Sequence, residues 1–135
     1  GDPKDLPEVI ENIKKLIGKK PIFGICLGHQ LMALANGADT YKMKFGHRGI
    51  NQPVKYLATG RIYISAQNHG YAVDEKSLEG KGINISHISM NDGTIEGLEY
   101  TKHPTFTVQY HPEACPGPGD HDYLFKHFVD MMEGR

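Results

Sequence analysis

The feature that most constrains this chain is a cysteine between two glycines, where a short apolar run meets an amphipathic segment. Residues 22–25 are apolar and too few for a helix, whereas residues 27–35 place apolar side chains on one helical face. Cys26 is therefore predicted to lie on a sharp turn between a strand and a helix. Such a turn needs small residues two positions before and after it, and Gly24 and Gly28 meet that need.

The local segment allows two interpretations of Cys26. At the N-terminus of the following helix, free N–H groups and the helix dipole favour the thiolate, which is the nucleophilic form of cysteine. Alternatively, Cys26 closes a buried core strand, and the glycines only permit close packing of the helix. Residues elsewhere in the chain have to decide between the two.

Composition excludes several classes of function. The chain has 135 residues, a size typical of one domain that needs no disulfide or metal to hold its core. Its formal net charge is -1, with no basic face for nucleic acid and no polybasic run for a membrane. Cys26 and Cys115 form no framework of pairs, which suits a reducing compartment. We therefore expect a cytoplasmic protein with free thiols that binds neither nucleic acid nor membrane.

Apolar residues at helical spacing predict three helices. The first covers residues 6–17, with Asp5 and Glu8 resembling a capping box and Gly18 standing where a C-terminal glycine belongs. The second covers residues 27–35 and stops at an Asn-Gly pair. The apolar face of the last helix is formed by Leu124, Phe125, Phe128, Val129 and Met132.

Short runs between these helices predict the strands. Residues 22–25 are apolar on both faces, as in a central strand of a parallel sheet. Residues 46–53 are loop-like, and Asn91-Asp92-Gly93 signals a hairpin. The other strands are expected at 41–45, 61–67, 83–88, 94–100 and 105–110. This order predicts an α/β fold whose mostly parallel central sheet is sandwiched by helices and carries an antiparallel addition.

Cys26 and His111 each follow directly after a predicted strand. Because ligands bind at the carboxyl ends of strands in such sheets, the two residues can meet there. A cysteine nucleophile needs a base within reach and an acceptor that orients the base, and His111 and Glu113 supply both. The alternatives for this pair are a surface turn or two ligands of a metal site. No tight spacing offers a third ligand, so we expect no metal.

The remaining histidines that lack a partner motif are interpreted as solvated or satisfied within the core. They are His87, His103, His121 and His127. Cys115 is interpreted in the same way, as a spare thiol in a loop.

Several motifs, in order, resemble the class I glutamine amidotransferases. Residues 24–30, which read GICLGHQ, and the His111-Pro112-Glu113 motif carry the resemblance to the family. Four further segments resemble the amidotransferase domain of carbamoyl-phosphate synthetase small subunits, at residues 42–47, 51–54, 67–73 and 111–118. The resemblance implies the flavodoxin-like fold of this family, with residues 1–135 forming a partial glutaminase domain.

The same resemblance implies hydrolysis of L-glutamine to glutamate without a cofactor, the ammonia passing to a carbamoyl-phosphate synthetase large subunit. Cys26 would attack the side-chain amide and form a glutamyl thioester, His111 would move the proton, and Glu113 would orient His111. The N–H of Leu27 would bind the oxyanion, as the geometry of the turn also suggests. The substrate would be held by Gln30 and by the backbone of Asn68, Gly70 and Tyr71. Without the resemblance, Gln30 could be an ordinary residue on a helix surface, and residues 68–71 could be a plain turn.

In this family, further strands precede the first helix, after a loop that reads roughly Ser-Asn-Gly-Pro-Gly-Asp-Pro. This chain starts with Gly1-Asp2-Pro3, so we expect the first strands and a second oxyanion donor to be missing. An exposed edge or core face would then favour poor folding as a monomer, or association. Two other functions stay open: an amidotransferase subunit for anthranilate, GMP or aminodeoxychorismate synthesis, and a non-catalytic interaction domain of the same fold.

Overall fold

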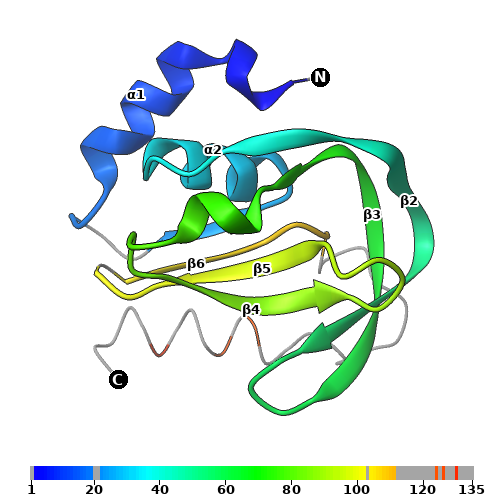
Figure 1. Ribbon diagram of the computed structural model, residues 1–135. Helices are drawn as coiled ribbons and strands as arrows, with labels where there is room; N and C mark the ends of the chain where they lie inside the picture. Colours follow the sequence, from blue (N-terminus) through cyan, green and yellow to red (C-terminus); the bar gives the residue numbers. More distant parts are fainter. Residues whose placement is uncertain are drawn as a thin grey trace.

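The computed structural model describes residues 2–19, 22–102 and 104–111, together with Leu124, Lys126 and Asp130. Within these residues, six strands form one sheet in the order β1-β6-β5-β4-β2-β3. Figure 1 shows two helices, α1 and α2, on one side of the sheet. The expected α/β class is therefore confirmed.

The sheet is mixed. Its strands are β1 (Ile22–Ile25), β2 (Thr40–Tyr56), β3 (Arg61–Val73), β4 (Ile83–Ser89), β5 (Ile95–Tyr100) and β6 (Thr105–Val108). Strands β1 and β6 are parallel, whereas the other pairings in the described ranges are antiparallel. The antiparallel part is thus larger than the sequence indicated, and the Asn91-Asp92-Gly93 hairpin that joins β4 and β5 is confirmed.

In the described part of the chain, β1 pairs only with β6 and lies at the edge of the sheet. Its predicted central position is therefore wrong for these residues. An apolar run of four residues indicates that a strand is covered on its faces. It does not say how many strands lie beside it.

The helices are α1 (Pro7–Leu16) and α2 (Leu27–Ala35), with 3-10 turns η1 (Pro3–Asp5) and η2 (Glu75–Leu78). The bounds of α2 agree with the prediction. The capping box at Asp5 and Glu8 is wrong, because Leu6 is the N-cap of α1 and makes no side-chain hydrogen bond. Pro7 occupies the first helical position, where its missing N–H costs nothing, and Asp5 belongs to η1. No helix in the described ranges is long and apolar enough to span a membrane.

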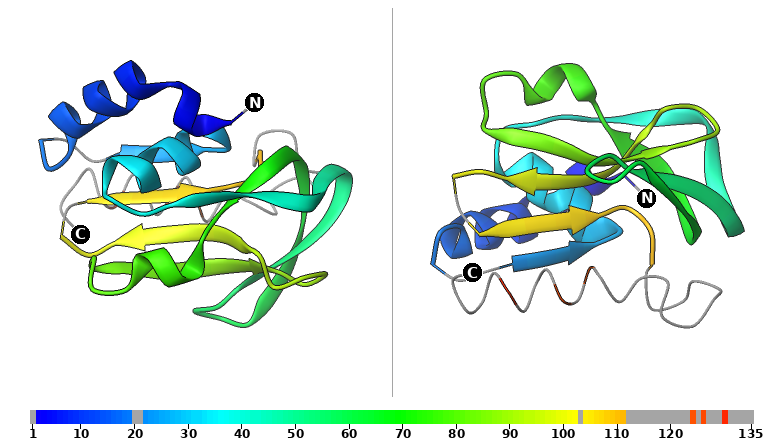
Figure 2. Two further views of the ribbon diagram at one scale, coloured as in Figure 1. Left: turned by 45° about the horizontal axis from the view of Figure 1, so that its top comes forward. Right: turned by 90° about the horizontal axis from the view of Figure 1, so that it is seen from below.

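Two clusters of buried apolar side chains form the core. Helices α1 and α2 lie over one face of the sheet (Figure 2). The first cluster lies between the helices and the sheet and includes Met32 of α2 and Leu98 of β5, with Ile13 of α1 packed against it. The second lies on the opposite face and joins Phe106 of β6 to Leu124, which is helical. Successive side chains of a strand alternate between faces, which is how the sheet serves both clusters. The other apolar residues predicted for the last helix lie outside the described ones.

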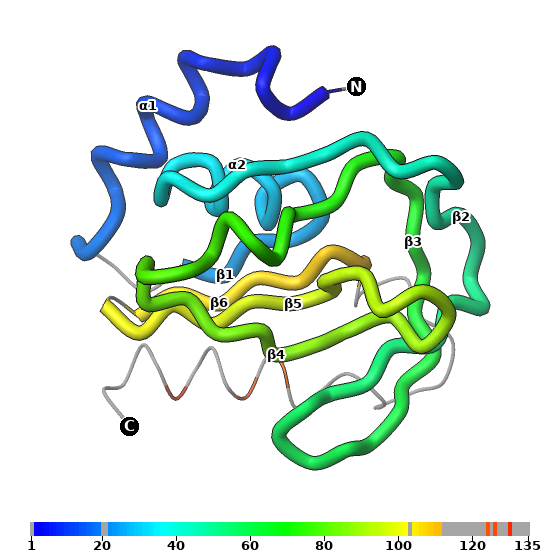
Figure 3. Tube along the Cα trace, viewed as in Figure 1, coloured from blue at the N-terminus to red at the C-terminus, as the bar shows by residue number. Residues whose placement is uncertain are grey.

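Strands β2 and β3 form a long antiparallel ribbon that curves along one side of the molecule (Figure 3). The loop predicted at residues 46–53 is wrong, since these residues belong to β2. Their glycines and proline are accommodated by register shifts between Lys42 and His47 and between Gly49 and Gln52. Irregularities of this kind bend a strand without ending it, so loop-like composition was a misleading signal.

Gly24 and Gly28 contribute differently to the contact between α2 and the sheet. A Cβ atom on Gly24 would lie 2.8 Å from Thr107 Cγ2 and 3.1 Å from the backbone C and O of Gly28. A Cβ atom on Gly28 would meet no described atom within 4 Å. The need for a small residue is therefore steric at Gly24, and packing within the described residues does not impose it at Gly28.

We predict that Gly24→Ala lowers the free energy of unfolding by about 1–3 kcal/mol, because the added methyl overfills the contact with Thr107 and α2. The matched control Gly28→Ala should leave stability unchanged or raise it by up to about 1 kcal/mol, because alanine favours a helix over glycine. Chemical denaturation followed by circular dichroism measures both. Equal destabilisation by the two substitutions would contradict this account of the packing.

His29 is a fully buried histidine on the sheet-facing side of α2. Its Nδ1 lies 2.8 Å from Thr107 Oγ1, and its Nε2 has no hydrogen-bond partner among the described residues. Burial, with smaller contributions from His69 and His87, lowers the pKa of His29 to about 3. The folded protein therefore holds this ring neutral.

We predict that His29 makes the fold sensitive to acid. Between the ordinary histidine pKa near 6.5 and the folded pKa of about 3, the unfolded chain binds a proton that the folded chain excludes. Stability attributable to His29 is complete above the upper value and falls by about 1.4 kcal/mol per pH unit as pH drops through this window. The prediction is tested by measuring the free energy of unfolding of the wild type and of His29→Asn across this pH range. The free energy of the variant should depend less steeply on pH, and parallel pH profiles would refute the assignment to His29.

Candidate active site

Cys26 lies on a strained turn between β1 and α2. Among the described residues, it is the single non-glycine residue with a positive φ, at φ 52 and ψ -106. Such a conformation costs a residue with a side chain on the order of 1–2 kcal/mol and is typical of functional sites. The N–H of Cys26 donates to the carbonyl of Val108 at 2.9 Å, which ties the turn to β6. The predicted strand-turn-helix geometry is therefore confirmed.

The surroundings of the thiol can stabilise negative charge. Cys26 is partly buried and immediately precedes Leu27, the first residue of α2. The first N–H groups of a helix have no acceptor within it, so they are directed toward the turn. The N–H of Gln30 is already used, since it donates to the carbonyl of Cys26 at 3.3 Å. Leu27 stays the predicted oxyanion donor.

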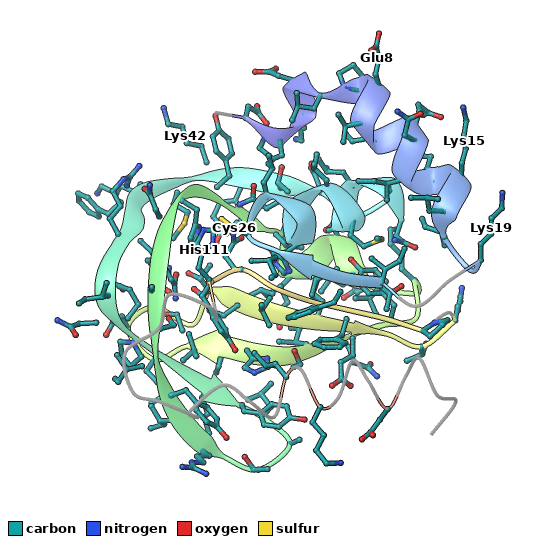
Figure 4. All side chains as sticks on the ribbon, turned by 180° about the vertical axis from the view of Figure 1, so that it is seen from behind. Glu8, Lys15, Lys19, Cys26, Lys42 and His111 are labelled. Carbon is teal, nitrogen blue, oxygen red and sulfur yellow. The ribbon has the colours of Figure 1, made fainter. Side chains whose placement is uncertain are left out.

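His111 follows β6, the strand that pairs with β1. The parallel register places Ile25 beside Val108, so the ends of the two strands lie side by side, as predicted. The N–H of His111 donates to the carbonyl of Ala66 in β3 at 2.9 Å. Figure 4 shows Cys26 and His111 at this end of the sheet. The fold therefore brings the predicted nucleophile and base to one region.

Glu113, the predicted orienting carboxylate, lies outside the described residues, and so does Cys115. The complete arrangement of Cys26, His111 and Glu113 consequently stays a prediction.

His87 behaves as a histidine satisfied within the core. It is buried in β4, its Nδ1 lies 2.8 Å from Ser86 Oγ, and its ring stacks on Tyr56 with 4.8 Å between centroids. His103, His121 and His127 lie outside the described residues.

Two buried glutamines form a hydrogen-bonded chain that ends at Cys26. Gln30 Nε2 donates to the Tyr71 carbonyl at 2.8 Å and to Gln109 Oε1 at 3.0 Å. Gln109 Nε2 lies 3.5 Å from the carbonyl oxygen of Cys26 and 3.9 Å from its Sγ. Because the Tyr71 carbonyl can only accept, it fixes the orientation of both amides. Gln30 is therefore not the helix-surface residue of the alternative interpretation.

Gln109 was not singled out in the sequence, although a signal for it exists. It stands two residues before His111, and β6 ends at Val108 just before it. An amide at the carboxyl end of a strand, beside a candidate base, is in the position where polar groups of such sheets meet ligands. The structure places it against the thiol.

The segment with Asn68, Gly70 and Tyr71 continues β3, so its interpretation as a plain turn is wrong. In the ribbon, His69 pairs with His47 and Tyr71 with Lys42, which leaves residues 43–46 of β2 opposite Gly70 alone. A bulge of this kind interrupts the ladder, and bulges are frequent next to active sites. The proposed role of this backbone in holding a substrate stays a prediction.

A second polar cluster, which the sequence did not reveal, lies between the β2–β3 ribbon and β5. It consists of His47, Gln67, His69 and Glu96, all buried, with Asp92 at its margin. His47 Nδ1 lies 3.0 Å from Glu96 Oε1, and His47 Nε2 lies 2.7 Å from Asp92 Oδ2. The alternation of Ser65, Gln67 and His69 on one face of β3 was the available signal.

The charges of this cluster are strongly coupled. The contact with Glu96 outweighs burial and, with help from Asp92, raises the pKa of His47 to about 9. Burial raises the pKa of Glu96 to about 7 against the pull of His47. Burial also lowers the pKa of His69 to about 4. The two histidines thus differ in charge at neutral pH although both are buried.

A family model described as "Glutamine amidotransferase class-I" matches residues 1–131. Carbamoyl phosphate synthase small chains of Listeria monocytogenes (serotype 4b, strain F2365) and Bacillus cereus (strain ATCC 14579) are both 62% identical to this chain, over 135 and 133 residues. These alignments cover 100% and 98% of this chain, but 37% and 36% of the relatives. The chain therefore spans a little more than a third of the length of these curated relatives.

Two solved structures share the fold. One is a candidate GMP synthase subunit from Thermoplasma acidophilum, with a TM-score of 0.78 and 21% identity over 98% of this chain and 68% of that one. The other is a glutamine amidotransferase from Thermotoga maritima, with a TM-score of 0.64 and 22% identity over 96% of this chain and 56% of that one. At these identities, the likeness concerns the fold alone.

The geometry and the comparisons agree. A strained cysteine joins a strand to a helix, a histidine follows the neighbouring parallel strand, and the family match covers nearly the whole chain. The chain belongs to the class I glutamine amidotransferases.

Proposed function

We propose that this chain carries a glutaminase site that hydrolyses L-glutamine to glutamate and ammonia, and that the ammonia is supplied to a carbamoyl phosphate synthase large subunit. The observation that carries the proposal is the strained turn at Cys26 beside the strand end that leads to His111. The sequence identity of 62% between this chain and carbamoyl phosphate synthase small chains supports this choice of synthetase.

In the first half of the reaction, Cys26 Sγ attacks the side-chain carbonyl carbon of glutamine. A C–S bond forms, the carbonyl oxygen becomes an oxyanion, and His111 accepts the thiol proton. The N–H of Leu27, at the start of α2, would stabilise that oxyanion. His111 then returns the proton to the amide nitrogen as the C–N bond breaks, which releases ammonia and leaves a glutamyl thioester.

In the second half, water attacks the thioester. His111 takes a proton from the water, the C–S bond breaks, and the proton passes to the departing thiolate, so glutamate leaves and Cys26 is regenerated. A carboxylate that holds the far nitrogen of His111 would keep its tautomer correct, which is the role we propose for Glu113.

Gln30 is suited to bind the substrate with one particular atom. Both hydrogens of its amide are used, by the carbonyl of Tyr71 and by Gln109. Its Oε1 is thus the atom left for a ligand, and it can only accept a hydrogen bond. We propose that it accepts from the ammonium group of glutamine, while the N–H groups at Asn68, Gly70 and Tyr71 hold the rest of the substrate.

Two alternatives are less well supported. An amidotransferase subunit of another synthetase would share the site, but the structural likeness to a candidate GMP synthase subunit has 21% identity, against 62% for the carbamoyl phosphate synthase small chains. A non-catalytic domain would not need the strain at Cys26, which costs stability.

We predict that Cys26→Ser lowers glutamate release by at least about 10³-fold, because the hydroxyl is a far weaker nucleophile than the thiolate. Cys115→Ser is the matched control and should retain activity. The assay is run on the chain with and without an added carbamoyl phosphate synthase large subunit. A glutamine-like chloroketone provides a second measurement, since it should label Cys26 selectively. Undiminished glutamate release from Cys26→Ser would contradict the proposal.

We predict that Gln109→Glu slows alkylation of Cys26 by about 10-fold or more at neutral pH, since a carboxylate near the thiol opposes formation of the thiolate. The substitution keeps the shape and the acceptor for Gln30, but it replaces the Nε2 donor that faces Cys26. Gln52→Glu, in β2, is the control and should leave the rate unchanged. An unaltered alkylation rate in Gln109→Glu would show that this amide does not influence the thiol.

A further inference from the structure

The cluster formed by His47, Gln67, His69 and Glu96 brings together side chains from three strands. His47 comes from β2, Gln67 and His69 from β3, and Glu96 from β5. Their exposed fractions are 6%, 4%, 7% and 0%. One ligand atom from each of His47, His69 and Glu96 can be chosen so that all lie within 4.8 Å of one another.

Hydrogen bonds outside the cluster fix which atoms face inward. His69 Nδ1 lies 2.8 Å from the carbonyl of Tyr71, which can only accept. The proton of a neutral ring is therefore on Nδ1, and Nε2 presents a lone pair. His47 Nε2 is held in the same way by the Asp92 carboxylate at 2.7 Å, so Nδ1 is the inward nitrogen.

The orientation of Gln67 follows from a similar argument. The hydroxyl of Ser65 donates its single proton to the carbonyl of Gln52 at 2.6 Å. Ser65 Oγ can then only accept from Gln67, whose Nε2 lies 2.8 Å away. Gln67 Oε1 is consequently turned toward the two histidines, 3.0 Å from His47 Nδ1 and 2.8 Å from His69 Nε2.

Once the proton leaves His47 Nδ1, four electron-pair donors converge on one place. With the His69 ring neutral, Gln67 Oε1 and His69 Nε2 face each other at 2.8 Å as two acceptors, a repulsion that a proton or a metal ion between them would relieve. Glu96 Oε1 lies 3.0 Å from His47 Nδ1 as an ion pair, and neither Glu96 oxygen has a hydrogen bond of regular geometry from a described residue. A proton on His47 Nδ1 can be shared between Gln67 Oε1 and Glu96 Oε1, each 3.0 Å away. It leaves His69 Nε2 and the second Glu96 oxygen without a donor among the described residues.

We propose that His47 Nδ1, His69 Nε2, Glu96 Oε1 and Gln67 Oε1 bind one divalent transition-metal ion, with zinc the best match. Two imidazoles and a carboxylate are ligands that zinc and its neighbours favour. Ligands about 2.0–2.1 Å from a tetrahedral ion are roughly 3.4 Å apart. In the cluster, Gln67 Oε1 lies 3.0 Å and 2.8 Å from the inward nitrogens of His47 and His69, and the ligand atoms of His47, His69 and Glu96 lie within 4.8 Å of one another. Asp92 and the Tyr71 carbonyl would hold the outer nitrogens of the histidines, as supporting acceptors do in metal sites.

This inference is independent of the proposed glutaminase chemistry and departs from the expectation that the chain holds no metal. Ligand spacing along the sequence could not reveal the site, because its ligands come from three strands. Binding would displace the proton from His47 Nδ1, and the ion would link β5 to the β2–β3 ribbon.

The test is titration of the metal-free protein with Co²⁺ at neutral pH, followed by visible absorption. Cys26→Ser and Cys115→Ser are introduced first, so that thiolates cannot be ligands. We expect one Co²⁺ per chain with the intense bands of a tetrahedral site, displaced by one equivalent of Zn²⁺. Absence of saturable binding, or weak octahedral bands only, would overturn the proposal.

Three variants assign the ligands. Glu96→Gln should weaken Co²⁺ binding at least about 10-fold, since the only anionic ligand is lost. Asp92→Asn, at a partly exposed position that should not disturb folding, should weaken it about 10- to 100-fold through the orientation of His47. His29→Asn is the control for a buried histidine elsewhere and should bind normally. Unchanged affinity in both Glu96→Gln and Asp92→Asn would refute the site.

Discussion

The hydrogen bond from the N–H of Cys26 to the carbonyl of Val108 holds the rest of the site in place. It extends the parallel pairing of β1 and β6 one residue beyond the strand, at the point where the chain must turn sharply. Without it, the left-handed backbone at Cys26 would relax, and α2 would no longer begin beside the end of β6. Gln109 lies against the thiol just after Val108, and His111 is held close by through a hydrogen bond of its own, from its N–H to the carbonyl of Ala66.

The sharp turn at Cys26 was predictable because every requirement for it is local. A sharp turn at Cys26 needs a short apolar strand, a small residue at Gly24 and an amphipathic helix, and each can be recognised within a few residues. The adjacency of Cys26 and His111 was also predictable, because both follow strands and strand ends share an edge. The resemblance to the amidotransferase family rested on the same residues, and the family match agrees with it.

What the sequence did not predict depends on contacts between distant residues. Residues 46–53 have the composition of a loop, yet pairing with β3 holds them in β2. The buried position of Glu96 is set by its neighbours across the ribbon, and an isolated glutamate in a strand carries no sign of them. The edge position of β1 in the described chain is likewise a property of the whole sheet.

The carbonyl of Tyr71 accepts from both Gln30 and His69, and so it belongs to two clusters at once. A ligand that moves the side chain of Gln30 would therefore act on a carbonyl that His69 also uses, and a ligand that moves His69 would act on the carbonyl that Gln30 uses. The proposed substrate and metal sites would then be thermodynamically linked, and the linkage would be reciprocal: whatever factor the ion imposed on the affinity for glutamine, glutamine would impose on the affinity for the ion. A single backbone oxygen would in this way make the proposed cation an effector of the proposed substrate site.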